Sequence, residues 1–310
     1  MCTLWSGGLP VMKKNHLTRE KLGNWVWGYV MILPLMAGLG VFYFYPVVKV
    51  IRDSFYNVGA FNKSSWAGLA NYEKMLSDSG MWKSLGNTFS YVLIIIPETV
   101  FFSLVLAALL NTKIKGQGLF RVIFFIPTVT MSAAIAMVWR WIFNGDFGIL
   151  NYLVKLFNGQ PHYWLSEQST ALVCISLVSI WMGVGYNMII LLGGIQGIPS
   201  VYYEAAELDG ASKPRQFFTI TLPLVTPTLF FVFTTTVIST LQIFDVIYMM
   251  IPAKSTAMRY TQSVVMYFYR NAFEFSKKGY ASAIAVFLFL IIMLLTLLQM
   301  RLQKKWVVYD

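Results

Sequence analysis

Six long apolar stretches alternate with shorter polar connectors along this chain of 310 residues. A helix needs roughly 20 residues to cross about 30 Å of hydrocarbon, and each stretch is long enough. Barrel strands are shorter and alternate in polarity, and an open sheet leaves backbone groups unbonded in lipid. The pattern therefore predicts an all-α polytopic membrane protein with six transmembrane helices, over Trp25–Tyr45, Phe89–Leu110, Val122–Phe143, Ala171–Leu192, Pro227–Met250 and Ala281–Met300.

Composition agrees with lipid as the main surroundings. Hydrophobic residues make up 57% of the chain and charged residues 12%, whereas a soluble domain carries about 25% charged residues. The net charge of +11 comes from basic residues on the flanks of apolar runs, where they anchor helices to lipid, so no nucleic-acid partner is expected. Cys2, Cys174, His16 and His162 are isolated from one another, and this excludes the clustered ligands of a metal site.

Charge placement predicts the orientation. With six spans, both termini lie on one side, and the 24 basic residues then divide evenly between the two sides. Short flanks near the first helix usually decide orientation. The basic N-terminal cluster and the short loop Asn111–Arg121 therefore favour termini in the cytoplasm. The expected organisation is a cytoplasmic tail over residues 1–24, a membrane domain over 25–300 and a second cytoplasmic tail over 301–310.

The N-terminal residues carry one further hypothesis. Met1–Val11 is apolar but too short to span, and Met12-Lys13-Lys14 follows it. Without a cleavage pattern of small residues, a signal peptide is not expected. We expect translation to start at Met12, with Met1 as the alternative.

The connector between the fourth and fifth apolar stretches, residues 200–223, is unusually ordered. Ser200 is placed to cap a helix that runs to Leu208, and Gly210 is placed to end it in a left-handed turn. Ser212 is placed to cap a second short helix, in which Pro214 is tolerated in the first turn. Pro223 should break the chain just before the fifth span. The pattern predicts a helix–turn–helix elbow at the cytoplasmic surface; a merely solvated loop is the alternative.

The first helix of this elbow has a small-residue face that another protein could approach closely. Ala205 and Ala206 provide the face, and Glu204, Glu207 and Asp209 place charge around it.

The elbow carries a recognisable spacing. It reads Glu204-Ala205-Ala206, three residues, Gly210, nine residues, Ile220, one residue and Leu222-Pro223. This pattern resembles the EAA loop of binding-protein-dependent ABC importer permeases. Other stretches are similar to the carbohydrate-uptake group of that family, which includes maltose and sn-glycerol-phosphate permeases: residues 120–127, 139–151, 241–248 and 279–299.

The resemblance implies a division of labour. It implies a second permease subunit that is a different chain, with a homodimeric ABC ATPase beneath the pair and an extracytoplasmic solute-binding protein outside. The solute would be a sugar, and the location a bacterial or archaeal cytoplasmic membrane. The coupling helix would fit a cleft on the ATPase through Glu204, Ala205, Ala206, Leu208 and Gly210.

No cofactor is expected on this chain, because it lacks the GxxxxGK[ST] phosphate loop. ATP and magnesium would be bound by the partner ATPase. The sequence also has no paired acids and no nucleophile–base set, so an enzyme is not predicted.

Polar residues at helical spacing predict a solute pathway. Ser179, Gly183 and Tyr186 share one face of the fourth span, and Thr235 and Gln242 share one face of the fifth. The resemblance implies the same assignment, because sugar contacts in maltose-type permeases come from these regions. The alternative is that these residues hold membrane helices together.

Two acids need separate interpretation. Glu98 follows Pro97 inside the second span, and ionisable residues at that depth are functional candidates by default. An ion-gradient-driven secondary transporter with Glu98 as its proton site is the alternative function, and a bundle-facing acid bonded to a neighbour is the structural one. Asp245, near the outer end of the fifth span, is interpreted as an interface or loop-anchoring charge.

Overall fold

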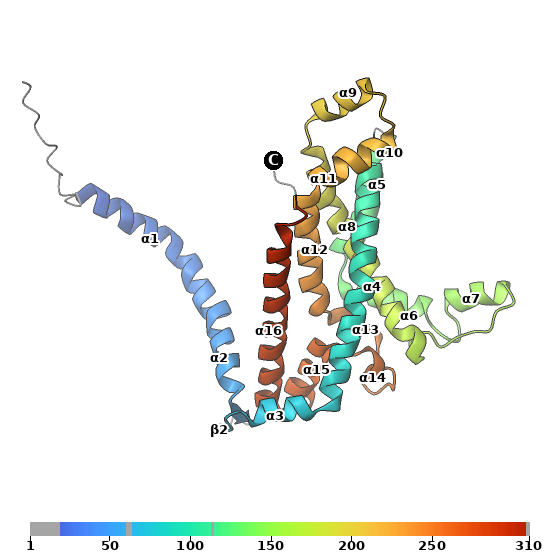
Figure 1. Cartoon of the computed structure of the whole chain (residues 1–310). Coiled ribbons are helices and arrows are strands. Elements are labelled where there is room, and N and C mark those ends of the chain that lie inside the picture. The colour runs from blue at the N-terminus through green and yellow to red at the C-terminus, as the bar shows by residue number, and fades with distance from the viewer. Residues whose placement is uncertain (1–18, 60–63, 113–114, 308–310) are drawn as a thin grey trace, which may run out of the picture. The chain divides into compact units, whose positions relative to one another are not determined.

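The computed structural model describes residues 19–59, 64–112 and 115–307 (Figure 1). Most of the predicted N-terminal tail, the choice between Met1 and Met12, and residues 308–310 of the predicted C-terminal tail lie outside the described residues. The chain divides into two compact units, residues 1–50 and 51–310.

The first unit is helical throughout its described part. It consists of α1 (Arg19–Leu39), the π-helical turn η1 (Gly40–Phe44) and the start of α2 (Tyr45–Asp53). Together they provide a helix from Trp25 to Asp53 that is long and apolar enough to cross a membrane. The predicted span ended at Tyr45; the helix continues because residues 46–53 keep apolar residues at helical spacing before Arg52 and Asp53 end the run.

The second unit begins with a small antiparallel hairpin outside the spans. Strand β1 (Tyr56–Val58) pairs with β2 (Ser64–Trp66), with Tyr56 opposite Trp66. Helix α16 (Lys278–Gln303) packs closely on β1. A Cβ atom on Gly279 would lie 2.0 Å from the carbonyl oxygen of Tyr56, so glycine is required at this contact.

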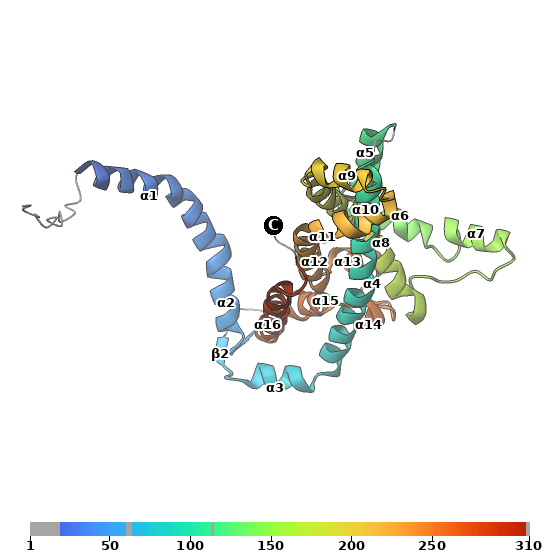
Figure 2. The same cartoon turned by 45° about the horizontal axis from the view of Figure 1, so that its top comes forward.

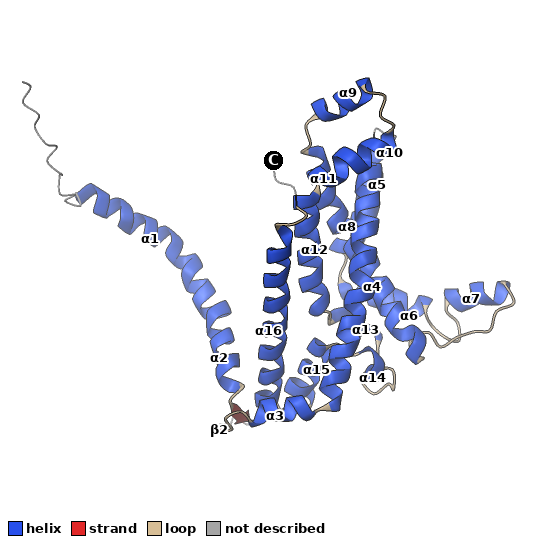
Figure 3. Ribbon diagram, viewed as in Figure 1, coloured by secondary structure: helices blue, strands red, loops and turns tan. Residues whose placement is uncertain are grey.

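Helices make up nearly all of the remaining chain (Figure 3). Two of them form the centre of the bundle, where α4 (Ser79–Leu110) packs along α8 (Gln168–Gln196). The others are α3 (Ala70–Ser77), α5 (Gln117–Val129), α6 (Ser132–Ile142), α7 (Ile149–Leu156), α9 (Ser200–Leu208), α10 (Lys213–Gln216), η2 (Phe217–Thr221), α11 (Leu222–Leu224), α12 (Thr226–Leu241), α13 (Asp245–Met250), α14 (Met258–Thr261), α15 (Val264–Tyr269) and η3 (Arg270–Glu274).

The helices that carry the second, fourth and sixth predicted spans are continuous. They are α4, α8 and α16, and each helix is longer than the apolar stretch that predicted it. Pro97 does not interrupt α4. Among the described residues four helices are long enough to cross a membrane, and six spans result if each of two bent pairs is one span.

The third and fifth predicted spans are not continuous helices, which corrects the sequence prediction. Helices α5 and α6 meet at 97°, because Thr130 leaves the helical conformation after Pro127 in the last turn of α5. The segment Lys213–Leu224 meets α12 at 67°, so the bend lies at Val225 and not at Pro223. Helix α12 then ends at Leu241, and α13 is separate.

Asp78 ties three helices together at one end of the bundle. Its carboxylate accepts hydrogen bonds from Tyr267 Oη and Tyr280 Oη at 2.6 Å each and from the Gly80 amide at 2.8 Å. It thereby caps α4 and links it to α15 and α16. Partial burial raises the pKa of Asp78, but these hydrogen bonds outweigh it and hold the pKa below its ordinary value.

The two ends of the bundle are distinct (Figure 1). One end holds α9, α10, the beginning of α5 and the C-terminal end of α16. Helices α3, α14 and α15 lie toward the other end. The elbow is therefore at the same end as the α4–α5 loop, which the sequence analysis placed in the cytoplasm.

Candidate functional site

A polar cavity of about 480 Å³ lies between α8 and α12. All five residues predicted for the solute pathway line it: Ser179, Gly183, Tyr186, Thr235 and Gln242. Ser179, Gly183 and Tyr186 meet because the i, i+4, i+7 spacing puts them on one face of α8. Thr235 lies on α12, and Gln242 follows directly after its last residue. Contact of these five residues with solute stays a prediction.

The hydroxyl groups of Ser179 and Thr235 bond to their own helices, whereas Thr128 Oγ1, also in the cavity wall, donates to the Met182 carbonyl at 3.1 Å and joins α5 to α8. Ser179 Oγ donates to the carbonyl of Ile175 at 2.9 Å, and Thr235 Oγ1 donates to that of Phe231 at 2.9 Å. This leaves their lone pairs free to accept from a ligand. These two bonds do not join helices within the described residues; contact with solute and the alternative role in holding membrane helices together both stay predictions.

One side chain in the wall does bridge the two helices. Asn187 is buried, and its Nδ2 donates to Thr236 Oγ1 at 3.4 Å, joining α8 to α12. It fixes the distance between the two walls while the cavity surface remains polar. Its place beside the Tyr186 face is visible in the sequence, but its partner on α12 is not.

A smaller hollow of about 120 Å³ continues from this wall toward α4. It shares Ser179 and Gly183 and adds Thr99, whose Oγ1 is buried and has no hydrogen-bond partner among the described residues. A Cβ atom on Gly183 would lie 3.4 Å from Thr99 Cγ2. This is an ordinary van der Waals distance, so Gly183 and Thr99 lie side by side in the wall of the smaller hollow.

Asp245 is exposed and also lines the cavity; its interpretation as an interface or loop-anchoring charge stays a prediction. It begins α13, directly after the break that ends α12. A sequence read as one span from Pro227 to Met250 places this acid near the membrane surface. The break is what turns it toward the cavity.

The elbow forms as two short helices joined by a left-handed glycine. Gly210 has φ of +74°, as predicted. The amide of Ala211 donates to the carbonyl of Ala206 at 2.9 Å, and that of Gly210 to Glu207 at 3.0 Å. This pair of bonds is the Schellman arrangement that ends helices.

The predicted caps of the elbow differ from those observed. Pro199 takes the N-cap position of α9, and Ser200 is its first helical residue, so the prediction of a Ser200 cap is wrong. Ser212 does precede α10, with Pro214 in the first turn, but its side chain makes no capping bond. Proline at the N-cap fixes the chain direction after Gly197 by its restricted φ.

Two interactions fasten the elbow. Tyr203 Oη and Thr221 Oγ1 lie 2.9 Å apart and join α9 to η2. Lys213 forms an ion pair with Glu207 across the glycine turn. The hydrogen bond from Lys213 holds the pKa of Glu207 below its ordinary value. These contacts make the elbow one unit, and sequence spacing alone did not identify them.

The outer face of α9 is left free. Glu204, Ala205, Leu208 and Gly210 are exposed, and Ala206 is half-buried. The Leu208 side chain is 91% exposed. An exposed leucine beside small residues and a carboxylate suits contact with another protein.

Glu98 lies away from the polar cavity. Its side chain is exposed and borders a separate apolar cavity of about 730 Å³ between α4, α5 and α8, with Phe102 and Trp181. The described residues provide neither a hydrogen bond nor an ion pair to it. The role of Glu98, including its interpretation as an acid bonded to a bundle neighbour, stays a prediction.

Comparisons with known proteins give a consistent result. The family model described as "Binding-protein-dependent transport system inner membrane component" matches residues 80–308. The probable ABC transporter permease protein YesP of Bacillus subtilis (strain 168) is 34% identical, covering 98% of this chain and 97% of YesP. The sulfoquinovosyl glycerol transport system permease protein SmoG of Agrobacterium fabrum is 30% identical, covering 91% of each chain. The trehalose/maltose transport system permease protein MalF of Thermococcus litoralis is 29% identical, covering 94% of this chain and 99% of MalF.

A solved structure has the same fold. It is that of a bacterial ABC transporter involved in the import of the acidic polysaccharide alginate, with a TM-score of 0.84. The match covers 93% of this chain and 98% of the other at 19% identity. At that identity the likeness concerns the fold.

Proposed function

This chain belongs to the family of binding-protein-dependent transport system inner membrane components, and from that premise we propose that it forms half of the import pathway for a sugar or sugar-like solute. As a member of that family it is the permease subunit of an ABC importer and not an enzyme. Relatives named for sulfoquinovosyl glycerol and for trehalose and maltose support the substrate class.

The polar cavity between α8 and α12 is the observation that carries the proposal. Sugars are bound by neutral donors and acceptors together with aromatic faces. Ser179, Thr235 and Gln242 supply the first, and Tyr186, which is half exposed, supplies the second. The volume of about 480 Å³ is within the range of small-molecule sites, about 300–1,000 Å³.

The elbow would couple this pathway to a separate motor. We infer that α9 lies in the cytoplasm and enters a cleft on a homodimeric ATPase, which binds ATP and magnesium. Glu204, Ala205, Ala206, Leu208 and Gly210 would form the contact. Exposure of α9 at one end of the bundle and the exposed Leu208 support this role.

The remaining partners follow from the same assembly. A second permease, of a different sequence, would supply the other half of the pathway, and an extracytoplasmic solute-binding protein would deliver the solute. Closure of the ATPase would push on the elbow and open the cavity outward, and reset would open it to the cytoplasm. A related fold solved with a pentasaccharide-bound periplasmic protein supports this arrangement.

The ion-gradient alternative finds no support in these comparisons. Its one candidate proton site, Glu98, borders the apolar cavity and not the polar one. A transporter that moved solute and proton together would place the acid where it could respond to the solute.

The test removes cavity hydroxyls without changing shape. We expect Ser179→Ala and Thr235→Val each to reduce uptake by about 2–10-fold, because a neutral hydrogen bond contributes about 0.5–1.5 kcal/mol. The matched control is Ser90→Ala. Ser90 Oγ bonds back to the Gly86 carbonyl at 3.0 Å in the same way, but the residue is half-buried and outside the cavity.

The proposal fails if both cavity variants transport like the control. Coupling has its own test: Glu204→Lys should leave the chain inserted but abolish uptake or co-purification of the ATPase. Normal uptake by Glu204→Lys would refute the role of the elbow and leave the cavity assignment standing.

A further inference from the structure

Helix α7 exposes a continuous apolar face. Ile149, Tyr152, Leu153 and Leu156 recur at i, i+3, i+4 and i+7, which is one side of a helix, and all four are exposed. Phe157 follows at the end of the helix and is 86% exposed. A surface of this kind on an eight-residue helix requires an apolar environment.

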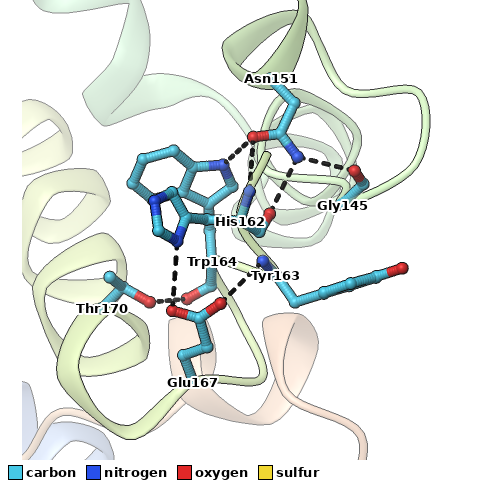
Figure 4. A network of polar contacts seen from close by, with 7 residues as sticks. All are labelled: Gly145, Asn151, His162, Tyr163, Trp164, Glu167 and Thr170. Atoms are coloured by element: carbon cyan, nitrogen blue, oxygen red, sulfur yellow. Dashed lines mark hydrogen bonds and ion pairs between the residues drawn. The ribbon is translucent and has the colours of Figure 1, made fainter. Parts of the chain in front are cut away.

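The opposite side of α7 is fixed by a buried polar network (Figure 4). Asn151 is 1% exposed. Its Oδ1 accepts from Trp164 Nε1 at 2.8 Å and from the His162 amide at 3.1 Å. Its Nδ2 donates to the carbonyls of Gly145 at 2.6 Å and His162 at 2.8 Å. All four hydrogen-bonding positions of the amide are used, so α7 cannot rotate its apolar side inward without breaking them.

The same network ties the α7 loop to the beginning of α8. Glu167 Oε1 accepts from the Tyr163 amide at 3.1 Å, and Thr170 Oγ1 donates to the Trp164 carbonyl at 2.8 Å. These hydrogen bonds therefore fix the orientation of the apolar face of α7 relative to α8, which is long enough to span a membrane.

The course of the chain directs α7 sideways. The 97° bend between α5 and α6 turns the chain away from the direction of α5. Figures 1 and 2 both show α7 beside the bundle, and in neither view does it continue the line of α4. Helix α6, which precedes it, also exposes apolar residues, among them Met137, Val138 and Trp141.

We propose that α7 is an interfacial membrane helix. Its apolar face lies at the boundary of headgroups and acyl chains, at the half of the bundle from which α8 begins. Lys155 is exposed on the same short helix, and its ammonium reaches the lipid phosphates while its stem follows the apolar side. A docking site for a water-soluble binding protein would instead lie beyond the ends of the spans.

The experiment uses the full chain reconstituted in lipid nanodiscs with its associated subunits. A spin label is attached at Tyr152→Cys, after replacement of Cys2 by serine; Cys174 is buried. The control label is at Thr256→Cys, which is exposed in the polar loop after α13. Collision with oxygen, which partitions into lipid, is compared with collision with a water-soluble nickel chelate.

We expect the ratio of oxygen to nickel accessibility to be severalfold higher at residue 152 than at residue 256. A second label at Leu156→Cys, on the same face, should reproduce the result, which guards against local misfolding at one site. A ratio equal to that of the control would place α7 in water and overturn the proposal. Low accessibility to both reagents would show that protein covers α7, and this would overturn it as well.

Discussion

The glycine turn of the elbow gives the sharpest test of how the fold carries function. Gly210 has φ of +74°, and a Cβ atom built there meets nothing within 4 Å. Gly210→Ala therefore introduces backbone strain without a steric clash. A change in hydrogen exchange within the elbow of the isolated chain therefore measures the left-handed conformation.

The magnitude follows from the backbone. A residue with a Cβ in the left-handed region costs about 1–2 kcal/mol. This cost opposes the two amide hydrogen bonds that close the turn, from Gly210 to Glu207 and from Ala211 to Ala206. One to two kcal/mol corresponds to about a 5–30-fold shift in population, so the turn should open about 5–30 times more often.

Hydrogen exchange measured by mass spectrometry reports this opening directly. Amides in residues 206–216 of Gly210→Ala should exchange about 5–30-fold faster than in the unmodified chain, and uptake should fall with it. Gly210→Asn should be milder, because asparagine tolerates the left-handed region.

The matched control is Gly193→Ala, near the end of α8. A Cβ at Gly193 also meets nothing within 4 Å, but its backbone is helical, so alanine should be neutral or stabilise by about 0.5–1 kcal/mol. The reasoning is refuted if the two alanine variants exchange alike, or if uptake falls in Gly210→Ala while exchange in the elbow is unchanged.

Three other changes test the bundle. The pKa of folded Asp78 lies below its unfolded value of about 3.9, so its contribution is complete above that pH. In denaturant titrations, the unfolding free energy should fall relative to Asp78→Asn as pH drops below about 4. Gly185→Ala would place Cβ 1.9 Å from the Phe124 carbonyl oxygen and should lower stability by about 1–3 kcal/mol or more. Gly118→Ala, whose added Cβ meets open space, should not lower stability. Equal melting temperatures of the two variants in detergent would contradict the close packing of α8 on α5. Glu98→Gln should transport normally at every pH assayed, and a pH-dependent loss of uptake would contradict this.

The sequence predicted the helical class and the faces that meet at the cavity, because both depend on local periodicity. Ser179, Gly183 and Tyr186 are brought together by one helix, and Thr235 and Gln242 by the turns that end another. Spacing along a single helix is enough to place such residues on a common side. The left-handed turn at Gly210 was predictable for the same reason, since it depends on one residue type.

What the sequence did not provide depends on contacts between elements. The chain bends by 97° after α5, and α13 is separate from α12. In the sequence both places lie within continuous apolar runs, because hydropathy does not record the direction of the chain. The place of Asp245 in the cavity lining was not predicted for the same reason. The Tyr203–Thr221 bond joins residues 18 positions apart, and Asn151 bonds to residues 6 to 13 positions away; no local pattern reveals these contacts.

The chain connects the elbow directly to both helices that form the cavity walls. Helix α8 carries Ser179 and Gly183 in the cavity wall and runs unbroken to Gln196, three residues before the proline at which α9 begins. On the other side the chain leaves the elbow through η2 and bends at Val225 into α12, the second wall. Because the Tyr203–Thr221 bond closes the elbow across this junction, a push on α9 would reach both walls as a displacement of rigid helices. The cavity would then change shape mainly where α8 and α12 face each other, with the Asn187–Thr236 contact as the point about which they separate.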